Sequence, residues 1–215
     1  MIRMSTSNKS LFISFEGIDG CGKSTQVQLL HDRLEARSAK VRIVREPGGT
    51  DISEKIRAIL LNPDNQTITS KTEALLMTAS RAQLTREIIY PLLNKGYHVL
   101  ADRYADSTIA YQGGGRNLSF QDLKQINRFA TDDLDPDITF FIDISPEDAI
   151  RRSGVFTPDR IEGAGLELQH QVRKAYLNIA NEDLKRFMVI DGYNSIDGIH
   201  SIIWDKIINY SHENS

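Results

Sequence analysis

A phosphate-binding pattern stands near the start of the chain, in residues 17–25 (GIDGCGKST). Its spacing matches G-x-x-x-x-G-K-[ST], in which glycines let the backbone take positive φ so that several N–H groups converge on one phosphate. Lys23 is expected to reach the β and γ phosphates of a nucleoside triphosphate, and the Ser24 hydroxyl to bind Mg²⁺. The residues expected to bind ATP are Gly17, Ile18, Asp19, Gly20, Cys21, Gly22, Lys23, Ser24 and Thr25.

The segments on either side of this loop favour a phosphate site over a chance glycine turn. An alternating apolar run, 11–15, leads into the loop, and an amphipathic stretch that ends near Arg37 follows it. Strand, loop and helix in this order place the phosphate at a helix N-terminus, whose partial positive charge stabilises an anion. The loop therefore predicts binding of ATP with magnesium, but by itself it does not distinguish a kinase from a GTPase switch or an ATP-driven machine.

Arginines beside predicted turns and strand ends indicate phosphoryl transfer. A guanidinium fork holds phosphates through two parallel hydrogen bonds and neutralises the charge that develops as a phosphoryl group moves. Any one arginine is more often a solvated surface residue, but Asp102 and Arg103 end a predicted strand, where ligands of parallel sheets collect. The arginines in question are Arg45, Arg57, Arg81, Arg103, Arg151, Arg152 and Arg160.

Two sets of side chains at helical spacing are candidates for a second-substrate pocket. Met77 and Arg81 are four residues apart, so they share one helix face as an apolar floor beside a donor fork. Thr108, Tyr111 and Gln112 share another face. Together these residues are expected to hold a flat polar base, although ordinary core packing explains Met77 equally well on spacing alone.

Predicted strands alternate with helices, which is typical of a parallel sheet covered on both faces. The strands are expected at 11–15, 41–45, 98–102, 138–142 and 187–191. After the first helix, further helices are expected at about 51–61, 70–94, 107–112, 119–130, 145–152, 166–185 and 196–208. The predicted fold class is α/β, a three-layer fold with a five-stranded parallel sheet, helices on both of its faces and a short lid.

Local signals set some of the expected helix ends. Ser70 and Glu73 have the spacing of a capping box, which is expected to open the helix over 70–94. Pro91 is expected to kink or shorten the last turn of that helix. The glycines at 113–115 are expected to end the helix that carries the second set of base-pocket candidates.

Length and composition bound the class of protein. At 215 residues and a formal charge of −3, the chain suits one α/β domain and offers no broad basic field for a nucleic-acid polymer or an anionic membrane. One cysteine excludes an intramolecular disulfide, and no run has the length and apolar character of a signal peptide or a bilayer span. The expected layout is a disordered tail (1–10), one domain (11–210) with a lid at about 151–163, and a second tail (211–215), in a soluble cytoplasmic protein.

Linked motifs resemble bacterial thymidylate kinase, a P-loop nucleoside monophosphate kinase, over nearly the whole chain from about Leu11 to Ile208. They read E-G-I-D-G-C-G-K-S-T, R-E-P-G-G-T, T-E-A-L-L-M-T-A-S-R, D-R-Y-A-D-S-T-I-A-Y-Q-G and D-R-I-E, in that order. The resemblance implies transfer of the γ-phosphoryl group of ATP to dTMP, which gives ADP and dTDP for dTTP biosynthesis. It also implies Mg²⁺ as the cofactor and a homodimer.

The resemblance implies roles for individual residues in the phosphoryl transfer. Asp19 is expected to organise magnesium and the acceptor phosphate, and it forms the expected metal site with Ser24 and Asp102. Lys23 is expected to steady the transferring group, and Arg103 to clamp the thymidylate phosphate.

The same resemblance places further side chains around dTMP. Glu46 and Arg57 are expected to border the phosphate pocket, and Tyr111 to lie against the deoxyribose, where it leaves little room for a 2′-hydroxyl. The residues expected to bind dTMP are Glu46, Arg57, Met77, Arg81, Arg103, Thr108, Tyr111 and Gln112, of which Arg81, Thr108 and Gln112 read the thymine.

The chain departs from the usual family pattern at two positions, and its phosphate loop has no arginine. Relatives of that kind supply basic residues from the lid, so Arg152 and Arg160 are expected to close over the ATP phosphates; a solvated basic helix end is the alternative. Met77 stands where the family usually has Phe, which leaves the selectivity for dTMP over dUMP open. Cys21 stands where the family usually has a small residue and is expected to contribute only its backbone and its bulk. The helix N-terminus also favours a lowered pKa of its thiol, which would make it prone to oxidation.

Two other functions remain open at this point. One is a kinase for another pyrimidine monophosphate such as dUMP, since loss of a methyl group costs a hydrophobic pocket only about 1–3 kcal/mol. The other is a nucleotide switch that has kept the fold and lost the transfer activity. The presence of Asp19, Lys23 and Arg103 argues against the switch.

Overall fold

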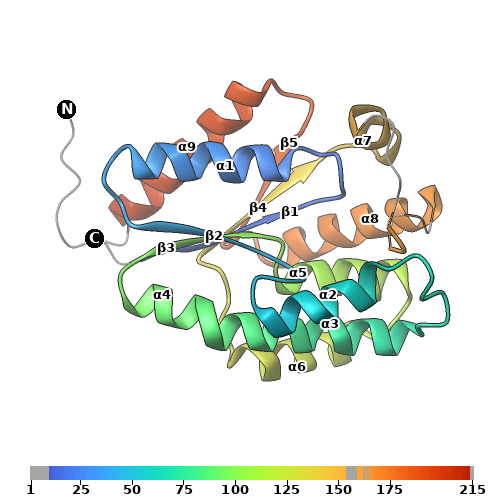
Figure 1. The fold of residues 1–215 in the computed structure, drawn as a ribbon. Helices are drawn as coiled ribbons and strands as arrows, with labels where there is room; N and C mark the ends of the chain where they lie inside the picture. Colours follow the sequence, from blue (N-terminus) through green and yellow to red (C-terminus); the bar gives the residue numbers. More distant parts are fainter. Residues whose placement is uncertain (1–9, 154–158, 162, 164, 214–215) are drawn as a thin grey trace.

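The structure of the chain, a computed structural model, describes residues 10–153, 159–161, 163 and 165–213. Its sheet has five parallel strands in the order β2-β3-β1-β4-β5 (Figure 1). The strands are β1 (Phe12–Glu16), β2 (Val41–Arg45), β3 (His98–Asp102), β4 (Ile138–Asp143) and β5 (Phe187–Asp191). The predicted α/β fold is thereby confirmed, and each strand lies within one residue of its predicted bounds.

Strand β1 lies at the centre of the sheet. It pairs with β3 and β4, so that Ser14 lies opposite both Ala101 and Thr139. All of its residues are buried, as expected for a strand covered on both faces. Because the phosphate loop follows β1 directly, the central position of this strand delivers the loop to the carboxyl edge of the sheet, between the ends of β3 and β4.

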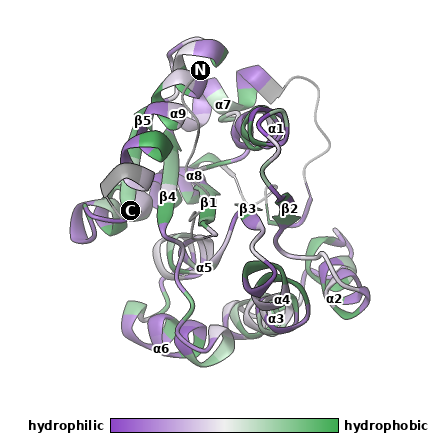
Figure 2. Cartoon of the chain, turned by 90° about the vertical axis from the view of Figure 1, so that its left-hand side faces the viewer, coloured by the Kyte–Doolittle hydropathy of each residue, from purple (hydrophilic) through white to green (hydrophobic). Residues whose placement is uncertain are grey.

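Helices cover both faces of the sheet. Figure 1 shows α1 and α9 on one face and α3, α4, α5, α6 and α8 on the other, and Figure 2 shows hydrophobic strands β1 and β4 between helices of mixed polarity. The described helices, with η for π-helical segments, are α1 (Lys23–Glu35), α2 (Asp51–Leu61), α3 (Ser70–Leu84), η1 (Thr85–Ile89), α4 (Tyr90–Asn94), α5 (Ala105–Thr108), η2 (Ile109–Gly115), α6 (Phe120–Thr131), α7 (Pro146–Ser153), α8 (Leu166–Glu182) and α9 (Ile196–Glu213).

The structure describes only part of the expected tails and of the expected lid. Of the predicted N-terminal tail, 1–10, the structure describes only Ser10, whose hydroxyl donates to the carbonyl oxygen of Leu93 at 3.0 Å. At the other end α9 continues to Glu213, so this helix takes in most of the predicted tail at 211–215. The centre of the predicted lid, 154–158, lies outside the described residues.

The long helix predicted over 70–94 consists of α3, η1 and α4 in succession. Its N-cap is Thr69, whose side chain accepts a hydrogen bond from the backbone N–H of Thr72 at 3.3 Å, so the capping box predicted at Ser70 is wrong by one residue. Pro91 lies in the first turn of α4, directly after the π-helical segment, and the helix continues to Asn94. The proline therefore stands where the helix changes from π to α geometry and the regular i to i−4 hydrogen-bond pattern is already interrupted.

The glycines at 113–115 are the last three residues of η2, so the helical stretch ends with them and not at Gln112, three residues earlier, as predicted. The reason is the packing of η2 on α8. A Cβ added at Gly114 would lie 2.4 Å from Cβ of Ala175 and 3.0 Å from the carbonyl oxygen of Gln171. Glycine at this position therefore allows the two backbones to approach each other closely.

Gly114→Ala is expected to lower the free energy of unfolding by about 2 kcal/mol, because the added methyl group must separate η2 from α8. Chemical denaturation of both proteins measures the difference. The matched control is Gly198→Ala in α9, where the added Cβ meets only Ser195 Oγ at 3.0 Å and Asn194 Cβ at 3.8 Å. The free energy of unfolding of that control is expected to rise by up to about 1 kcal/mol, because alanine has a higher helix propensity than glycine. If Gly114→Ala loses no more free energy of unfolding than Gly198→Ala, the close approach of η2 and α8 at Gly114 does not require glycine.

Candidate active site

The phosphate loop joins β1 to α1 through glycines in the left-handed region of backbone space. The φ angles are 141° at Gly17, 83° at Gly20 and 102° at Gly22. A Cβ added at Gly20 would lie 2.3 Å from the carbonyl oxygen of Ala149, so the loop packs directly on the backbone of α7. At Gly20, any residue larger than glycine is therefore disfavoured both by the backbone angle and by this contact.

Cys21 contributes bulk to the loop, as expected, but the lowered pKa predicted for its thiol is wrong. Its side chain is buried, with 1% of its surface exposed. Burial raises the pKa of the Cys21 thiol, and this effect exceeds the opposing influence of the Lys23 charge. The structure thus corrects the expectation of a thiol activated at the helix N-terminus; Cys21 packs as a small apolar residue.

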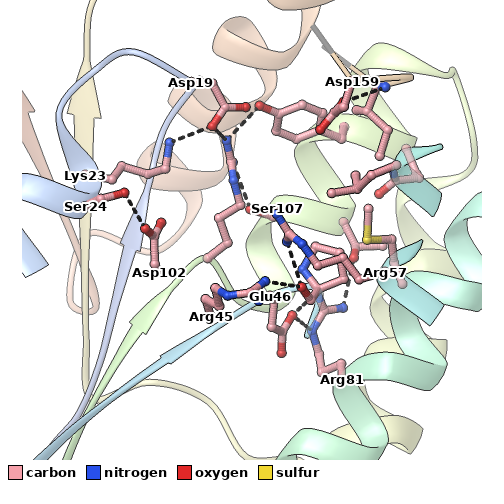
Figure 3. Close-up of a pocket in the computed structure, with 18 residues that line it drawn as sticks. Asp19, Lys23, Ser24, Arg45, Glu46, Arg57, Arg81, Asp102, Ser107 and Asp159 are labelled. Carbon is pink, nitrogen blue, oxygen red and sulfur yellow. Dashed lines mark hydrogen bonds and ion pairs between the residues drawn. The ribbon is translucent and has the colours of Figure 1, made fainter. Parts of the chain in front are cut away.

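Three charged side chains meet at the mouth of the phosphate loop (Figure 3). Lys23 Nζ donates to the carbonyl oxygen of Ile18 at 3.0 Å and lies 3.4 Å from Asp19 Oδ1. Arg103 Nη2 donates to the same carboxylate oxygen at 2.6 Å. Asp19 therefore bridges the lysine of the loop and the arginine at the end of β3, two cations from different parts of the chain.

Arg103 is held at this point by an unusual backbone and by aromatic neighbours. Its φ angle is 72°, in the left-handed region that non-glycine residues rarely adopt. Its N–H donates to the carbonyl oxygen of Phe15 at 3.0 Å, and its guanidinium donates to Tyr111 Oη at 3.1 Å and lies 5.0 Å from the centre of that ring. Strained residues of this kind cluster at functional sites, where the surrounding structure holds them in place.

Oxygen ligands suited to a divalent cation lie beside the loop. Ser24 Oγ donates to Asp102 Oδ2 at 2.6 Å, which joins the first turn of α1 to the end of β3. The Asp19 carboxylate lies across the mouth of the loop from this pair, as Figure 3 shows. Hydroxyl and carboxylate oxygens are the ligands that Mg²⁺ prefers, so the residues present fit this ion.

A cavity of about 300 Å³ extends from the loop between α2, α3 and η2. It brings together all the side chains that were predicted to bind dTMP, although they come from segments far apart in the sequence. These are Glu46, Arg57, Met77, Arg81, Arg103, Thr108, Tyr111 and Gln112, and Asp19, Lys23, Ser24 and Asp102 line its loop end.

Arg81 lines this cavity, but its N–H groups are bonded to protein acceptors and not left free for a base as expected. Every nitrogen of its buried guanidinium has a protein partner: Nε donates to Glu46 at 2.7 Å, Nη1 to Thr108 at 2.9 Å and Asn127 at 2.7 Å, and Nη2 to the carbonyl oxygen of Tyr104 at 3.0 Å. In this arrangement Arg81 orients Glu46 and Thr108 toward the cavity. Its own donors are already used.

Some residues that line the cavity were absent from the predicted site. They are Arg45, Pro47, Leu61, Ser107, Asp159 and Ile161. Arg45 Nη2 pairs with Glu54 at 3.0 Å, and Arg57 Nη1 donates to the carbonyl oxygen of Pro47 at 2.8 Å. Arg45 and Pro47 belong to the motif R-E-P-G-G-T, which was the available signal for them.

The two arginines expected over the ATP phosphates have protein partners elsewhere. Arg152 Nη1 donates to the carbonyl oxygen of Gly192 at 2.8 Å. Arg160 is buried, donates from Nε to the carbonyl oxygen of Leu60 at 2.8 Å and pairs with Glu73 at 2.7 Å. The structure therefore places neither side chain on the phosphate loop, and it places Arg160 behind the base pocket.

Glu16, the last residue of β1, is a buried acid that sequence reasoning missed. Its carboxylate accepts hydrogen bonds from Tyr104 N at 2.8 Å, Ser107 Oγ at 2.6 Å and Tyr176 Oη at 2.8 Å. Burial, with a smaller contribution from the charge of Asp106, raises the pKa of Glu16 from 4.5 to about 7. An acid at the end of a mainly apolar strand was the signal for it.

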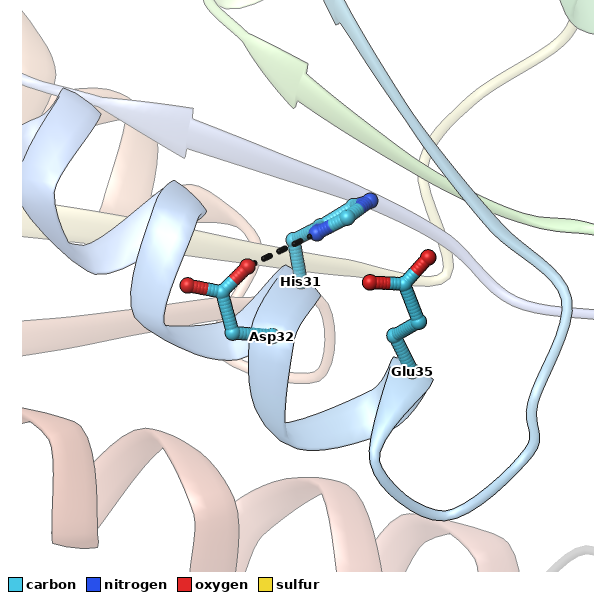
Figure 4. Close-up of side chains that lie close together, drawn as sticks. All are labelled: His31, Asp32 and Glu35. Atoms are coloured by element: carbon cyan, nitrogen blue, oxygen red, sulfur yellow. Dashed lines mark hydrogen bonds and ion pairs between the residues drawn. The ribbon is translucent and has the colours of Figure 1, made fainter.

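A second group of possible metal ligands lies on the surface of α1, near the end of the helix farther from the loop (Figure 4). Ligand atoms of His31, Asp32 and Glu35 lie within 4.8 Å of one another, and His31 Nδ1 is 3.0 Å from Asp32 Oδ1. Exposed groups of this kind are common on helices, and this one is not connected to the cavity. Among the described helices, none combines the length and the apolar character needed to cross a bilayer.

Fold and site together define a class of enzyme. A phosphate loop at the end of the central strand of a parallel sheet faces a cavity that holds arginines at one end and a set of neutral polar side chains at the other. This arrangement suits two substrates that both carry phosphate, with the base of the second one held in the cavity. The class is that of the P-loop nucleoside monophosphate kinases.

Comparisons with known proteins identify the family. The family model described as thymidylate kinase matches residues 15–203. The thymidylate kinase of Thermosipho melanesiensis is 51% identical over 193 residues, which is 90% of this chain and 95% of the relative, and that of Caldanaerobacter subterraneus subsp. tengcongensis is 45% identical over 199 residues, or 93% and 95%. A crystal structure of thymidylate kinase from Ehrlichia chaffeensis superposes with a TM-score of 0.77 at 33% identity and covers 93% of this chain and 99% of its own.

The chain belongs to the thymidylate kinase family, as its motifs predicted. This membership makes it a phosphotransferase of nucleotide biosynthesis.

Proposed function

We propose that this protein transfers the γ-phosphoryl group of ATP to dTMP and so produces ADP and dTDP, a step toward dTTP. The observation that carries the proposal is the position of Asp19. This carboxylate joins Lys23, which belongs to the ATP loop, to Arg103, which comes from the end of β3 and lines the same cavity. A shared partner of this kind supports a site at which two phosphates meet.

In the proposed reaction, an oxygen of the dTMP phosphate attacks the γ phosphorus in line with the bond to the β,γ-bridging oxygen. The new P–O bond completes dTDP, and the broken bond leaves its electron pair on ADP. Lys23 contacts the phosphates of ATP while Arg103 holds the phosphate of dTMP. Positioning and charge neutralisation are sufficient for such a transfer, so no covalent bond to the protein is needed.

Magnesium is the proposed cofactor, with Ser24, Asp102 and Asp19 as the residues that hold it directly or through water. When bound, the ion would supply positive charge that offsets the charge developing on the transferring phosphoryl group. Asp102→Asn is expected to raise the Mg²⁺ concentration at half-maximal velocity by about tenfold, because the pair with Ser24 loses its negative charge. The measurement is a Mg²⁺ titration at fixed ATP, with the exposed Asp64→Asn as the control. An unchanged titration would remove Asp102 from the metal site.

The experiment that tests the function measures release of ADP from ATP and Mg²⁺ with dTMP, dUMP, dCMP, dAMP or dGMP added one at a time. Release that depends strongly on dTMP is the expected result. Comparable specificity constants for dTMP and dUMP would support the wider pyrimidine kinase, since Met77 lines the cavity where the family usually has Phe. ATP binding without release in any mixture would support the nucleotide switch.

We assign the closing role over ATP to Arg152 rather than to Arg160. Arg152 lies at the end of α7, the helix on which the phosphate loop packs, and its bond to Gly192 is exchangeable because its side chain is exposed. Arg152→Ala is expected to raise KM for ATP about tenfold, as a charge-assisted hydrogen bond of about 1.5 kcal/mol is lost, and to leave KM for dTMP within twofold. Equal changes in both KM values would contradict this assignment.

A homodimer in the cytoplasm completes the proposal. Large apolar side chains are exposed on neighbouring helices, with Leu75 of α3 58% exposed and Phe129 of α6 87% exposed, and a second copy of the chain is the proposed cover. Sedimentation at micromolar concentration is expected to give a dimer, and a monomer would refute the proposed dimer.

The proposed cytoplasmic location is supported by the single cysteine of the sequence, which suits a reducing compartment.

A further inference from the structure

Glu73, a residue of α3, lies behind the wall of the base cavity. Its side chain is 1% exposed and has partners on both oxygens. Gln112 Nε2 donates to Oε1 at 2.9 Å, and Arg160 Nη2 lies 2.7 Å from Oε2. Arg116 Nε also approaches Oε1, at 3.3 Å. One buried carboxylate thus joins α3, η2 and the short segment that carries Arg160.

The Glu73 carboxyl is ionised in this environment. Burial opposes ionisation, but the hydrogen bond from Gln112 and the charges of Arg116 and Arg160 outweigh it, and the pKa of Glu73 lies below its usual value. An ionised carboxylate can only accept hydrogen bonds. The group that Gln112 turns toward Glu73 must therefore be its NH₂, and the carbonyl oxygen Oε1 is on the other side of the amide.

Gln112 lines the base cavity, so the direction of its amide decides what the cavity offers to a base. With NH₂ held by Glu73, the side chain presents an acceptor. Thr108 is complementary: its hydroxyl oxygen already accepts from Arg81 Nη1 at 2.9 Å, which leaves the hydroxyl hydrogen to be donated. An acceptor beside a donor matches a base edge that has N–H at position 3 and a carbonyl at position 4.

We propose that Glu73 is a positioning residue for base selection, which fixes the amide of Gln112 so that the cavity accepts thymine or uracil and rejects cytosine. Cytosine has an acceptor at N3 and an amino group at position 4, so both hydrogen bonds are mismatched. The inference deepens the proposed function and rests on it. It assigns Glu73 no contact with the substrate.

The test compares wild type with Glu73→Gln, using kcat/KM for dTMP and for dCMP, or the inhibition constant of dCMP where its turnover is too slow to measure. A glutamine at position 73 offers either a donor or an acceptor, so the amide of Gln112 is released to turn. The expected result is a drop of about tenfold in the preference for dTMP over dCMP, seen mainly in KM for dTMP, with KM for ATP unchanged. Glu73→Asp keeps the charge and is expected to retain most of the preference.

A purely structural role for Glu73 predicts a different pattern. In that case both substrates lose activity in the same proportion, and a preference that stays within twofold of wild type overturns the proposal. If Glu73→Gln fails to fold, Gln112→Leu gives the deciding measurement, because the inferred acceptor is then absent. A wild-type preference in Gln112→Leu overturns the proposal as well.

The same assays separate this inference from the proposed function. Wild-type protein is measured first with dTMP, and absence of dTMP-dependent ADP release contradicts the function itself. Wild-type activity with an unchanged base preference in Glu73→Gln contradicts only the role of Glu73. A double substitution of Glu73→Gln with Gln112→Leu is expected to show no further loss of preference beyond Gln112→Leu alone, since Glu73 acts through that amide.

Discussion

Arg103→Ala is expected to bind ATP as the wild type does and to lose about 10³-fold in kcat/KM for dTMP. A guanidinium that stabilises charge in a phosphoryl transfer contributes factors of about 10³ to 10⁵. Arg103 lines the cavity near its loop end, where its Nη2 donates to Asp19 Oδ1 at 2.6 Å. Its removal takes away the clamp for the acceptor phosphate and leaves the ATP loop, with Lys23, intact.

Calorimetric titration with ATP and a coupled ADP assay give the two measurements. Arg103→Lys is the matched control, because it keeps the charge at the same left-handed φ of 72° but loses the planar fork that bonds Asp19 and Tyr111 together. Its kcat/KM for dTMP is expected to lie between the values of wild type and Arg103→Ala. Unchanged turnover in Arg103→Ala would show that the residue is misassigned, and loss of ATP binding would point to a collapsed loop.

The parts of the fold that the sequence predicted well are those set by local pattern. Strands such as 138–142 read as continuous apolar runs because both faces of the sheet are covered. The phosphate loop is recognisable because glycines at fixed spacing meet a backbone requirement, confirmed by the positive φ at Gly17, Gly20 and Gly22. Helix caps such as Ser119, which accepts from the backbone N–H of Asp122, are likewise local.

The parts that the sequence did not predict depend on contacts between distant segments. The π-helical segment η2 keeps its glycines for contact with α8, some 60 residues later by the numbering of Gly114 and Ala175. Arg160 was expected over ATP because relatives whose phosphate loop lacks an arginine supply basic residues from the lid, yet it pairs with Glu73 of α3. No periodicity in the sequence encodes such a pairing, so the residue type was recognised and its partner was not.

Glu16 illustrates the same limit and carries the second large prediction, which concerns pH. Its carboxyl is fully buried, is bonded by the Ser107 and Tyr176 hydroxyls and lies in the field of Asp106 and Arg103. The pKa of Glu16 is raised to about 7 in the folded protein from 4.5, so the folded state binds more protons than the unfolded state between these values. Stability from this group is therefore fully present below pH 4.5 and is lost as pH rises through 7.

The expected size of this loss is about 2–3 kcal/mol between pH 5 and pH 8, since each pKa unit corresponds to about 1.4 kcal/mol. Glu16→Gln has no charge to bury, and the Ser107 and Tyr176 hydroxyls can rotate to accept from its amide. Over the same pH range, the free energy of unfolding of this variant is expected to decline by about 2–3 kcal/mol less than that of wild type. Urea denaturation at a series of pH values measures both curves.

The control is Glu167→Gln, which removes an exposed carboxylate at the start of α8 and is expected to leave the wild-type curve unchanged. Parallel curves for wild type and Glu16→Gln would mean that Glu16 does not titrate between pH 5 and pH 8. The acid remains in the chain despite its cost because Tyr104 N and Ser107 Oγ both donate to it, which fixes the backbone on one side of Arg103. We therefore expect Glu16→Gln to gain stability above pH 7 and to lose part of the activity that a correctly placed Arg103 supports.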